Sequence, residues 1–135
     1  MIIDAQNHFN KAAMQAVTVS AASTDLINQT KAGTAYGAGS LMFVARVGTA
    51  FTATGAGTLN IQIQTATDEA FSSPIVLYDS GAIAKTALTA NTIVATVDIG
   101  GMAFKQYVRV YYVVGTGPMT AGTIEAFFTP DVRVV

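Results

Sequence analysis

Short segments rich in Val, Ile, Thr, Tyr and Phe recur along the chain, separated by clusters of Gly, Ser, Asn and Pro. Useful runs with the 3.6-residue period of an amphipathic helix are missing, so the pattern is typical of β-strands joined by turns. Strands are predicted at 16–21, 41–48, 58–66, 75–79, 92–99, 106–114 and 122–129, with a shorter one at 25–28. Without a helical layer, such strands can bury their apolar faces only against one another. We therefore predict an all-β fold in which residues 1–135 form one jelly-roll or other Greek-key β-sandwich of about eight strands.

The connections between these segments carry the turn residues that such a fold needs. The glycine-rich stretch 48–58 is predicted to be a long hairpin, and 115–122 the turn between the last two long strands. Residues 67–74 are predicted to form one turn of helix that begins at Thr67 as its N-cap. Phe71 would then fold back into the core.

The charge content limits the partners that a chain of this size can have. Asp, Glu, Lys and Arg make up 11% of the 135 residues, against roughly 25% in an ordinary soluble domain, so the surface must be unusually neutral. The net charge is -1 and the basic residues are scattered, which argues against nucleic acid and anionic membrane as partners. No apolar run approaches the ~18 residues of a membrane-spanning helix.

Catalytic and cofactor chemistry are poorly supported. His8 is the sole histidine, and we expect it to be a plain polar residue of an N-terminal arm. Cysteine is absent and the eight acidic residues form no Asp-x-Asp-x-Asp loop, so neither zinc nor calcium has its usual ligands. The sequence predicts no enzyme activity, no metal site and no cofactor.

One strand carries a stripe of aromatic and basic residues. If Val108, Val110 and Tyr112 face inward, then Tyr107, Arg109 and Tyr111 form an outward row in which a guanidinium lies beside tyrosine rings. Tyrosine and arginine are enriched at interface hot spots, so this row is a candidate for contact with a partner. A sugar-stacking platform in a carbohydrate-binding module, and simple packing against a neighbouring strand, are the alternatives.

A second row consists of uncharged amides. Asn60, Gln62 and Gln64 alternate with apolar residues and should lie on the outer face of their strand. Charge is depleted at the centres of protein interfaces, because burying an unpaired charge costs far more than burying a hydrogen-bonded amide. We interpret this row, through Gln62 and Gln64, as a surface that another subunit covers, and we expect an oligomer in which a dimer is favoured.

The beginning of the chain carries apolar residues without clear periodicity, namely Ile2, Ile3 and Phe9. They suit an extended arm within residues 1–14 that places apolar anchors on a neighbouring molecule. An ordinary first strand and turn within the same domain explains them equally well.

Three stretches also carry a family resemblance: MIIDAQNHF followed by QAVTVSAASTDLI, LNIQIQTATDEAFSSPIVL, and QYVRVYYVVGTGPMTAGTIEAFFTPDV. In their order along most of the chain they resemble the small capsid cement, or decoration, proteins of tailed phages, notably those of short-tailed Bordetella phages. The chain departs from the family pattern after Thr24, where DLINQTKAGTAYGAG replaces an acidic-Leu-Gly run.

This resemblance implies a dimeric jelly-roll protein on the outer surface of the virion, made in the host cytoplasm. It would bind neighbouring major capsid proteins and would have no catalytic residues. Ile2, Ile3, Phe9, Gln62, Gln64, Tyr107, Arg109 and Tyr111 are the expected partner contacts.

Overall fold

The protein is a β-sandwich in a computed structural model that describes residues 8–10, 13–28, 42–98, 104–116 and 118–129. Within these residues there is no α-helix, and one short 3-10 turn, η2, covers Lys85–Ala87. The strands are β1 (Gln15–Ala16), β2 (Ala21–Ala22), β3 (Ile27–Asn28), β4 (Met42–Val47), β5 (Thr52–Ala53), β6 (Thr58–Ala66), β7 (Ile75–Asp79), β8 (Ile83–Ala84), β9 (Ile93–Asp98), β10 (Tyr107–Gly115), β11 (Met119–Ala121) and β12 (Thr123–Thr129). The predicted all-β class is confirmed.

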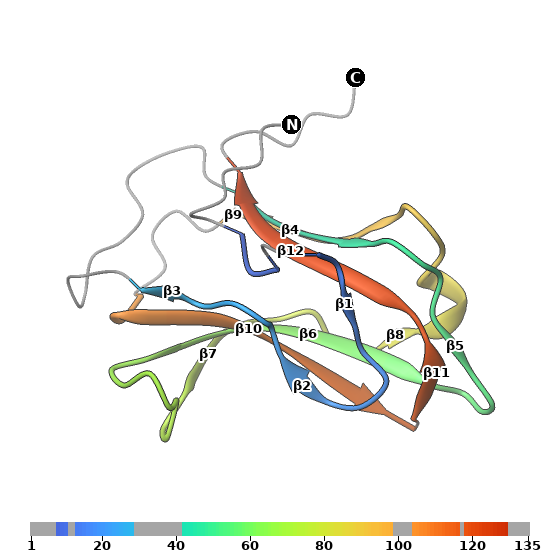
Figure 1. Ribbon diagram of the computed structural model, residues 1–135, viewed down its shortest axis with the longest axis horizontal. Coiled ribbons are helices and arrows are strands. Elements are labelled where there is room, and N and C mark those ends of the chain that lie inside the picture. The colour runs from blue at the N-terminus through green and yellow to red at the C-terminus, as the bar shows by residue number, and fades with distance from the viewer. Residues whose placement is uncertain (1–7, 11–12, 29–41, 99–103, 117, 130–135) are drawn as a thin grey trace.

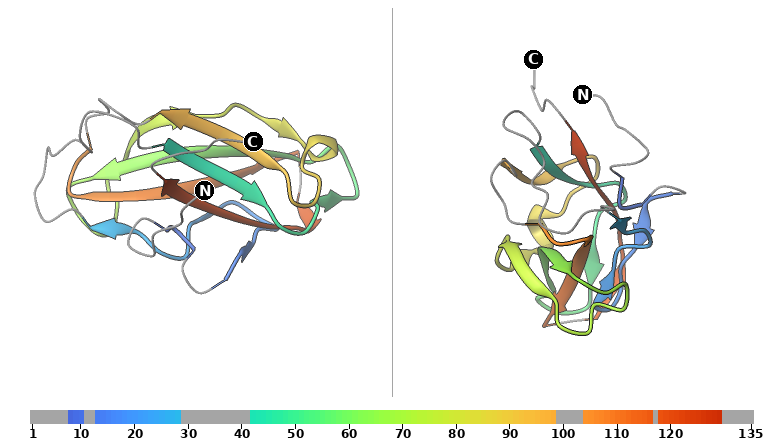
Figure 2. Two further views of the ribbon diagram at one scale, coloured as in Figure 1. Left: turned by 90° about the horizontal axis from the view of Figure 1, so that it is seen from above. Right: turned by 90° about the vertical axis from the view of Figure 1, so that its left-hand side faces the viewer.

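Two antiparallel sheets form the layers of the sandwich (Figure 1). One has the order β1-β12-β4-β9, and the other has the order β2-β10-β6-β7, with β3 beside β10 and β8 beside β6. From above, β12, β4 and β9 cross over β10 and β6 (Figure 2, left). The jelly-roll connectivity stays a prediction, which this strand order favours.

The core between the sheets follows from the two-residue alternation of the strands. Leu59, Ile61 and Ile63 from one sheet are fully buried, as are Phe43 and Phe128 from the other. Ring centroids of Phe43 and Phe128 lie 6.0 Å apart in an edge-to-face contact, the arrangement that aromatic quadrupoles favour.

The predicted strand boundaries agree best where the alternation is longest. The bounds of β6 and β7 are the predicted ones, while the single strand expected at 16–21 is wrong. There β1 and β2 belong to different sheets, since the chain crosses from one layer to the other between them. The described residues form more strands than the predicted eight, because β5, β8 and β11 are too short to show a period.

Two predicted connections also need correction. Residues 67–74 form no helix: the Asp68 carboxylate accepts hydrogen bonds from the Ser72 amide and hydroxyl, so Asp68 orders this loop in place of Thr67. The stretches 48–58 and 115–122 are not simple loops, because β5 and β11 pair with each other.

No helix in the part of the chain that the structure describes has the length and apolar character needed to cross a membrane.

Candidate protein-binding surface

The outer face of the larger sheet is built around the pair β6 and β10. Val108, Val110 and Tyr112 are fully buried, so the predicted orientation of β10 is confirmed. The residues between them face outward, and the antiparallel register sets Arg109 opposite Gln64 and Tyr111 opposite Gln62. The aromatic row and the amide row therefore lie side by side on one surface.

A chain of hydrogen bonds runs across this surface from a cation to an anion. Arg109 Nε donates to Gln64 Oε1 at 2.9 Å, and Gln64 Nε2 donates to Gln62 Oε1 at 3.1 Å. Gln62 Nε2 then donates to Asp79 Oδ2 at 3.1 Å, on β7. We name these four side chains the amide relay. Each amide in it both accepts and donates within the chain, so the relay already satisfies much of its own hydrogen-bonding capacity.

Aromatic rings hold the cationic end of the amide relay. The guanidinium carbon of Arg109 lies 4.2 Å from the centroid of the Phe71 ring and 5.1 Å from that of Tyr111. Burial lowers the pKa of Arg109, against an opposing contribution from Tyr111. An arginine titrates so far above neutrality that it stays charged, so this surface presents a fixed cation.

The structure corrects two expectations for this surface. Gln64 does not face water, since it is 7% exposed beneath its neighbours. Phe71 is buried, as predicted, but it contacts Arg109 on the outer face and is not part of the core between the sheets. The sequence signal for this contact is weak, because Phe71 lies in a loop with no periodicity.

The N-terminal residues behave differently from the predicted arm. Phe9 is fully buried, its ring centroid lies 5.0 Å from that of Phe128, and its amide donates to the carbonyl of Ala126. The prediction that Phe9 contacts a partner is therefore wrong, because its ring is part of this chain's own core. Ile2 and Ile3 lie outside the described residues.

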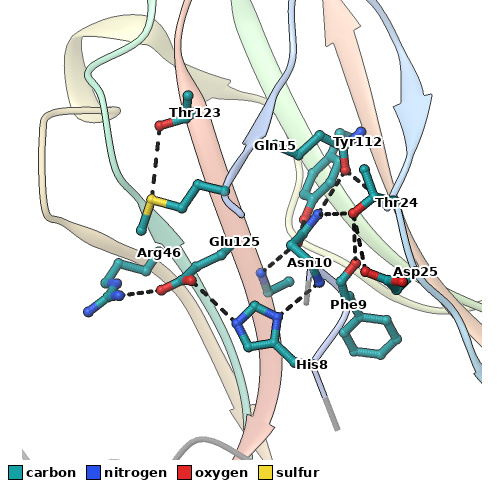
Figure 3. A network of polar contacts seen from close by, with 12 residues as sticks. His8, Phe9, Asn10, Gln15, Thr24, Asp25, Arg46, Tyr112, Thr123 and Glu125 are labelled. Carbon is teal, nitrogen blue, oxygen red and sulfur yellow. Dashed lines mark hydrogen bonds and ion pairs between the residues drawn. The ribbon is translucent and has the colours of Figure 1, made fainter. Parts of the chain in front are cut away.

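Next to Phe9 lies a buried polar network (Figure 3). His8 is 8% exposed, and its Nε2 lies 3.3 Å from Glu125 Oε2, while the other carboxylate oxygen of Glu125 pairs with Arg46. The backbone N–H of Asn10 donates to His8 Nδ1 at 2.9 Å. Because Nδ1 accepts this bond, the imidazole proton must be on Nε2. The expectation of a plain polar arm residue is wrong, and Glu125, its acidic partner, comes from a distant segment that sequence spacing does not reveal.

Asn10 extends the network into the core. Its Oδ1 accepts hydrogen bonds from the Ala126 amide at 3.0 Å and the Tyr112 hydroxyl at 3.1 Å. Its Nδ2 donates to Gln15 Oε1 at 2.8 Å. Burial, and then the charge of Glu125, raise the pKa of Tyr112 far above its usual range. Both ring nitrogens of His8, and both the oxygen and the nitrogen of the Asn10 side-chain amide, therefore have polar partners within the fold.

A family model with the description Bbp16 matches residues 11–128, which include all of β1 to β11 and nearly all of β12. The chain belongs to the Bbp16 family. The family name indicates a Bordetella phage protein, so the chain is a member of a bacteriophage-associated family. A comparison with curated proteins gives no match.

The described part of this Bbp16 chain offers little for small-molecule chemistry. No group of three or more His, Asp or Glu side chains among the described residues could hold a metal ion. An open hollow of about 330 Å³ beside Val19, Ser20, Val114 and Pro118 has no titratable side chain among these lining residues. Among the described residues, the amide relay and its aromatic neighbours form an outward-facing constellation that joins hydrogen bonds with cation–π contacts.

Proposed function

We propose that this Bbp16 protein is a non-enzymatic virion structural protein that binds the outside of a phage head. It would act as a cement, or decoration, protein that stabilises contacts between neighbouring major capsid proteins. The family name supports an association with phage, and the resemblance of the three sequence stretches to capsid cement proteins supports the role on the head.

The observation that carries this proposal is the amide relay. A polar group that enters an interface without a hydrogen-bond partner costs about 1–3 kcal/mol. In the relay, Gln62 and Gln64 already have partners on their own chain, so protein can cover them without leaving these bonds unmade. A neutral surface of this kind suits a protein that functions inside an assembly.

The proposed mechanism is addition of binding free energy across capsomer junctions. Each protomer would contribute modest contacts, and linking two protomers makes the second contact intramolecular at a high effective concentration. The shell would then resist heat and internal DNA pressure, because opening a junction requires the bound cement protein to be released. We place the contact with the capsid protein at the N-terminal segment 1–7, with Ile2 and Ile3 as apolar anchors.

The geometry of His8 supports a non-enzymatic role. A catalytic histidine needs a ring nitrogen free to exchange a proton with a nucleophile or substrate. In this fold, Asn10 occupies Nδ1 and Glu125 occupies Nε2, so the imidazole serves to fasten the chain to β12.

The test is co-sedimentation of the purified protein with heads of the parent phage that lack it. We expect saturable binding, and removal of residues 2–7 should weaken it while the domain stays folded. The cut must stop before His8, since His8, Phe9 and Asn10 hold the sandwich together. If the truncated protein binds the heads as well as the full chain does, segment 1–7 has no role in binding.

The second candidate function is that of a carbohydrate-binding module, and the same purified protein can be used to test it. Sugar stacking requires exposed ring faces, whereas Phe71 is buried and Arg109 lies over both Phe71 and Tyr111. We expect no saturable signal on a glycan array. A saturable glycan signal without head binding would favour the carbohydrate-binding module.

A further inference from the structure

We infer that the open edge of β7 binds an extended segment of another protein, one that carries apolar residues and has Lys or Arg at both ends. The segment would pair with β7 as an additional strand of the larger sheet. This inference rests on the proposed function and deepens it, because on a phage head the major capsid protein would supply the segment. It follows from the position, the side chains and the charge of β7.

The strand β7 lies at the edge of the larger sheet (Figure 1). Among the described residues it pairs with β6 on one side and with no strand on the other. The Ser80 amide donates to the Ile61 carbonyl, so the alternation of an antiparallel ladder turns the backbone N–H and C=O of Asp79 away from β6. Outward groups of this kind are a template on which another chain can pair.

Two consecutive apolar side chains of β7 are open to solvent. Ile75 and Val76 are each 46% exposed, and with Val19 they are the exposed large apolar side chains of the described residues. They pair with Thr65 and Gln64, which project to opposite faces of β6, so one of the two lies on each face of the sheet. An added strand also directs its side chains alternately to both faces, so it would cover both residues.

Carboxylates flank this edge at both ends. Asp68 and Glu69 lie in the loop that leads into β7, and Asp79 is the last residue of the strand. The ion pairs within the described part of the chain are those of Glu125, so none of these three carboxylates has a cationic partner there. A segment with a basic residue at each end complements this distribution of charge.

Two basic side chains of neighbouring segments are held by other groups. Lys85 Nζ donates to the carbonyl of Ala53 at 2.7 Å. Arg109 lies over the ring of Phe71, and its Nε donates to Gln64. The carboxylates of the edge therefore remain available to the cations of a partner.

The same charges disfavour a second copy of β7 as the occupant. Antiparallel pairing of two β7 strands would bring Asp79 of each copy beside the acidic loop residues of the other, and parallel pairing would set Asp79 beside Asp79. Like charges opposite each other on neighbouring strands are destabilising. A phosphate polymer is disfavoured as well, since β7 contributes no cation.

The experiment is a titration of the full chain with a blocked peptide of about seven residues, long enough to pair along the five residues of β7. In this peptide valine alternates with threonine, and a lysine stands at each end. We expect saturable binding, with amide chemical-shift changes in β7. Glutamate in place of both lysines should raise the dissociation constant about tenfold or more. N-methylation of all backbone amides of the peptide should abolish binding, because strand addition depends on main-chain hydrogen bonds.

Variants of the protein locate the binding site. Val76→Lys places a cation on the edge and removes an apolar contact, so it should raise the dissociation constant of the lysine-ended peptide about tenfold or more. Val19→Lys is the matched control, because it makes the same change at a valine that is 61% exposed outside β7, and it should leave binding unchanged. Glu69→Gln combined with Asp79→Asn should weaken binding and reduce its dependence on salt.

Several results would overturn the inference. These are a wild type without saturable binding, a methylated peptide that binds as well as the unmodified one, or equal binding by Val76→Lys and Val19→Lys although both are folded by circular dichroism. Self-association of the wild type that Val76→Lys abolishes would assign the edge to a second copy instead. If Val76→Lys does not fold, Val76→Thr replaces it and must weaken binding about threefold or more.

Head binding separates this inference from the proposed function. Heads that bind Val76→Lys as well as the wild type retain the proposed function and reject the capsid protein as the occupant of the edge. A wild type that binds the peptide but no heads retains the edge as a strand-binding surface and contradicts the proposed function.

Discussion

The Nε2 atom of His8 lies 3.3 Å from Glu125 Oε2, a contact that fastens the start of the described chain to the last strand, β12. The imidazole also stacks on Phe127, with ring centroids 5.6 Å apart. The contact is internal to the fold, so it contributes to the stability of the domain, and residues from His8 onward do not belong to a free arm.

Glu125→Ala should destabilise the fold by about 2–3 kcal/mol. Removing one member of a fully buried ion pair costs roughly 3–5 kcal/mol, and the effect is smaller here because the Arg46 side chain is 33% exposed. Urea denaturation measures the change in the free energy of unfolding. Glu69→Ala, in an exposed loop position, is the matched control and should change it by less than about 0.5 kcal/mol.

Asn10→Ala should be among the most destabilising polar substitutions in the chain. It leaves the Ala126 amide and the Tyr112 hydroxyl without their acceptor, at a cost of about 2–4 kcal/mol. The exposed Asn28, which accepts one bond from Gln106, supplies the control Asn28→Ala. Equal effects of the two substitutions on thermal unfolding would show that the Asn10 network does not stabilise the core.

Tyr112 should make the protein sensitive to alkaline pH. Its pKa is raised in the folded state, so the unfolded chain loses the phenolic proton first, at about pH 10. The contribution of Tyr112 to stability should therefore be constant below that pH and fall above it, with a slope approaching about 1.4 kcal/mol per pH unit. Tyr112→Phe should remove this component of the slope between pH 10 and 11.5, while Tyr107→Phe should keep it. Parallel curves for all three proteins would contradict the assignment.

Phe71 lies in the left-handed region of the backbone, with φ of 52°. Side chains with a Cβ are disfavoured there and glycine is not, so Phe71→Gly should be more stable than Phe71→Ala by about 0.5–1 kcal/mol. This reverses the usual order of the two residues. Both variants should also remove the contact between the Arg109 guanidinium and the Phe71 ring. Arg109→Ala should therefore cost less free energy of unfolding in either variant than in the wild type, and urea denaturation of the single and double variants measures this difference.

The fold class and the long strands were predictable because alternation in β6 and β10 is set by burial of one face. The orientation of Tyr107, Arg109 and Tyr111 followed from the same period. The pairing of Arg109 with Gln64 did not, since a two-residue change in register keeps every side chain on the same face and gives an equally regular pattern, and the register depends on contacts between distant strands.

Contacts of short or irregular segments were beyond sequence reasoning for a related reason. Phe9 and His8 have no periodicity around them, and their partners Phe128 and Glu125 lie at the other end of the chain. Only the three-dimensional path of the chain reveals that this segment is part of the sandwich.

The most direct test of the account is quantitative binding of the purified wild-type protein to parent phage heads that lack it, followed by imaging of the saturated heads. The account predicts a saturable number of copies on the outer surface, with the half-buried Gln62 of the amide relay covered by protein. A protein that stays in the supernatant at every concentration, or one bound with Gln62 still open to solvent, would contradict it.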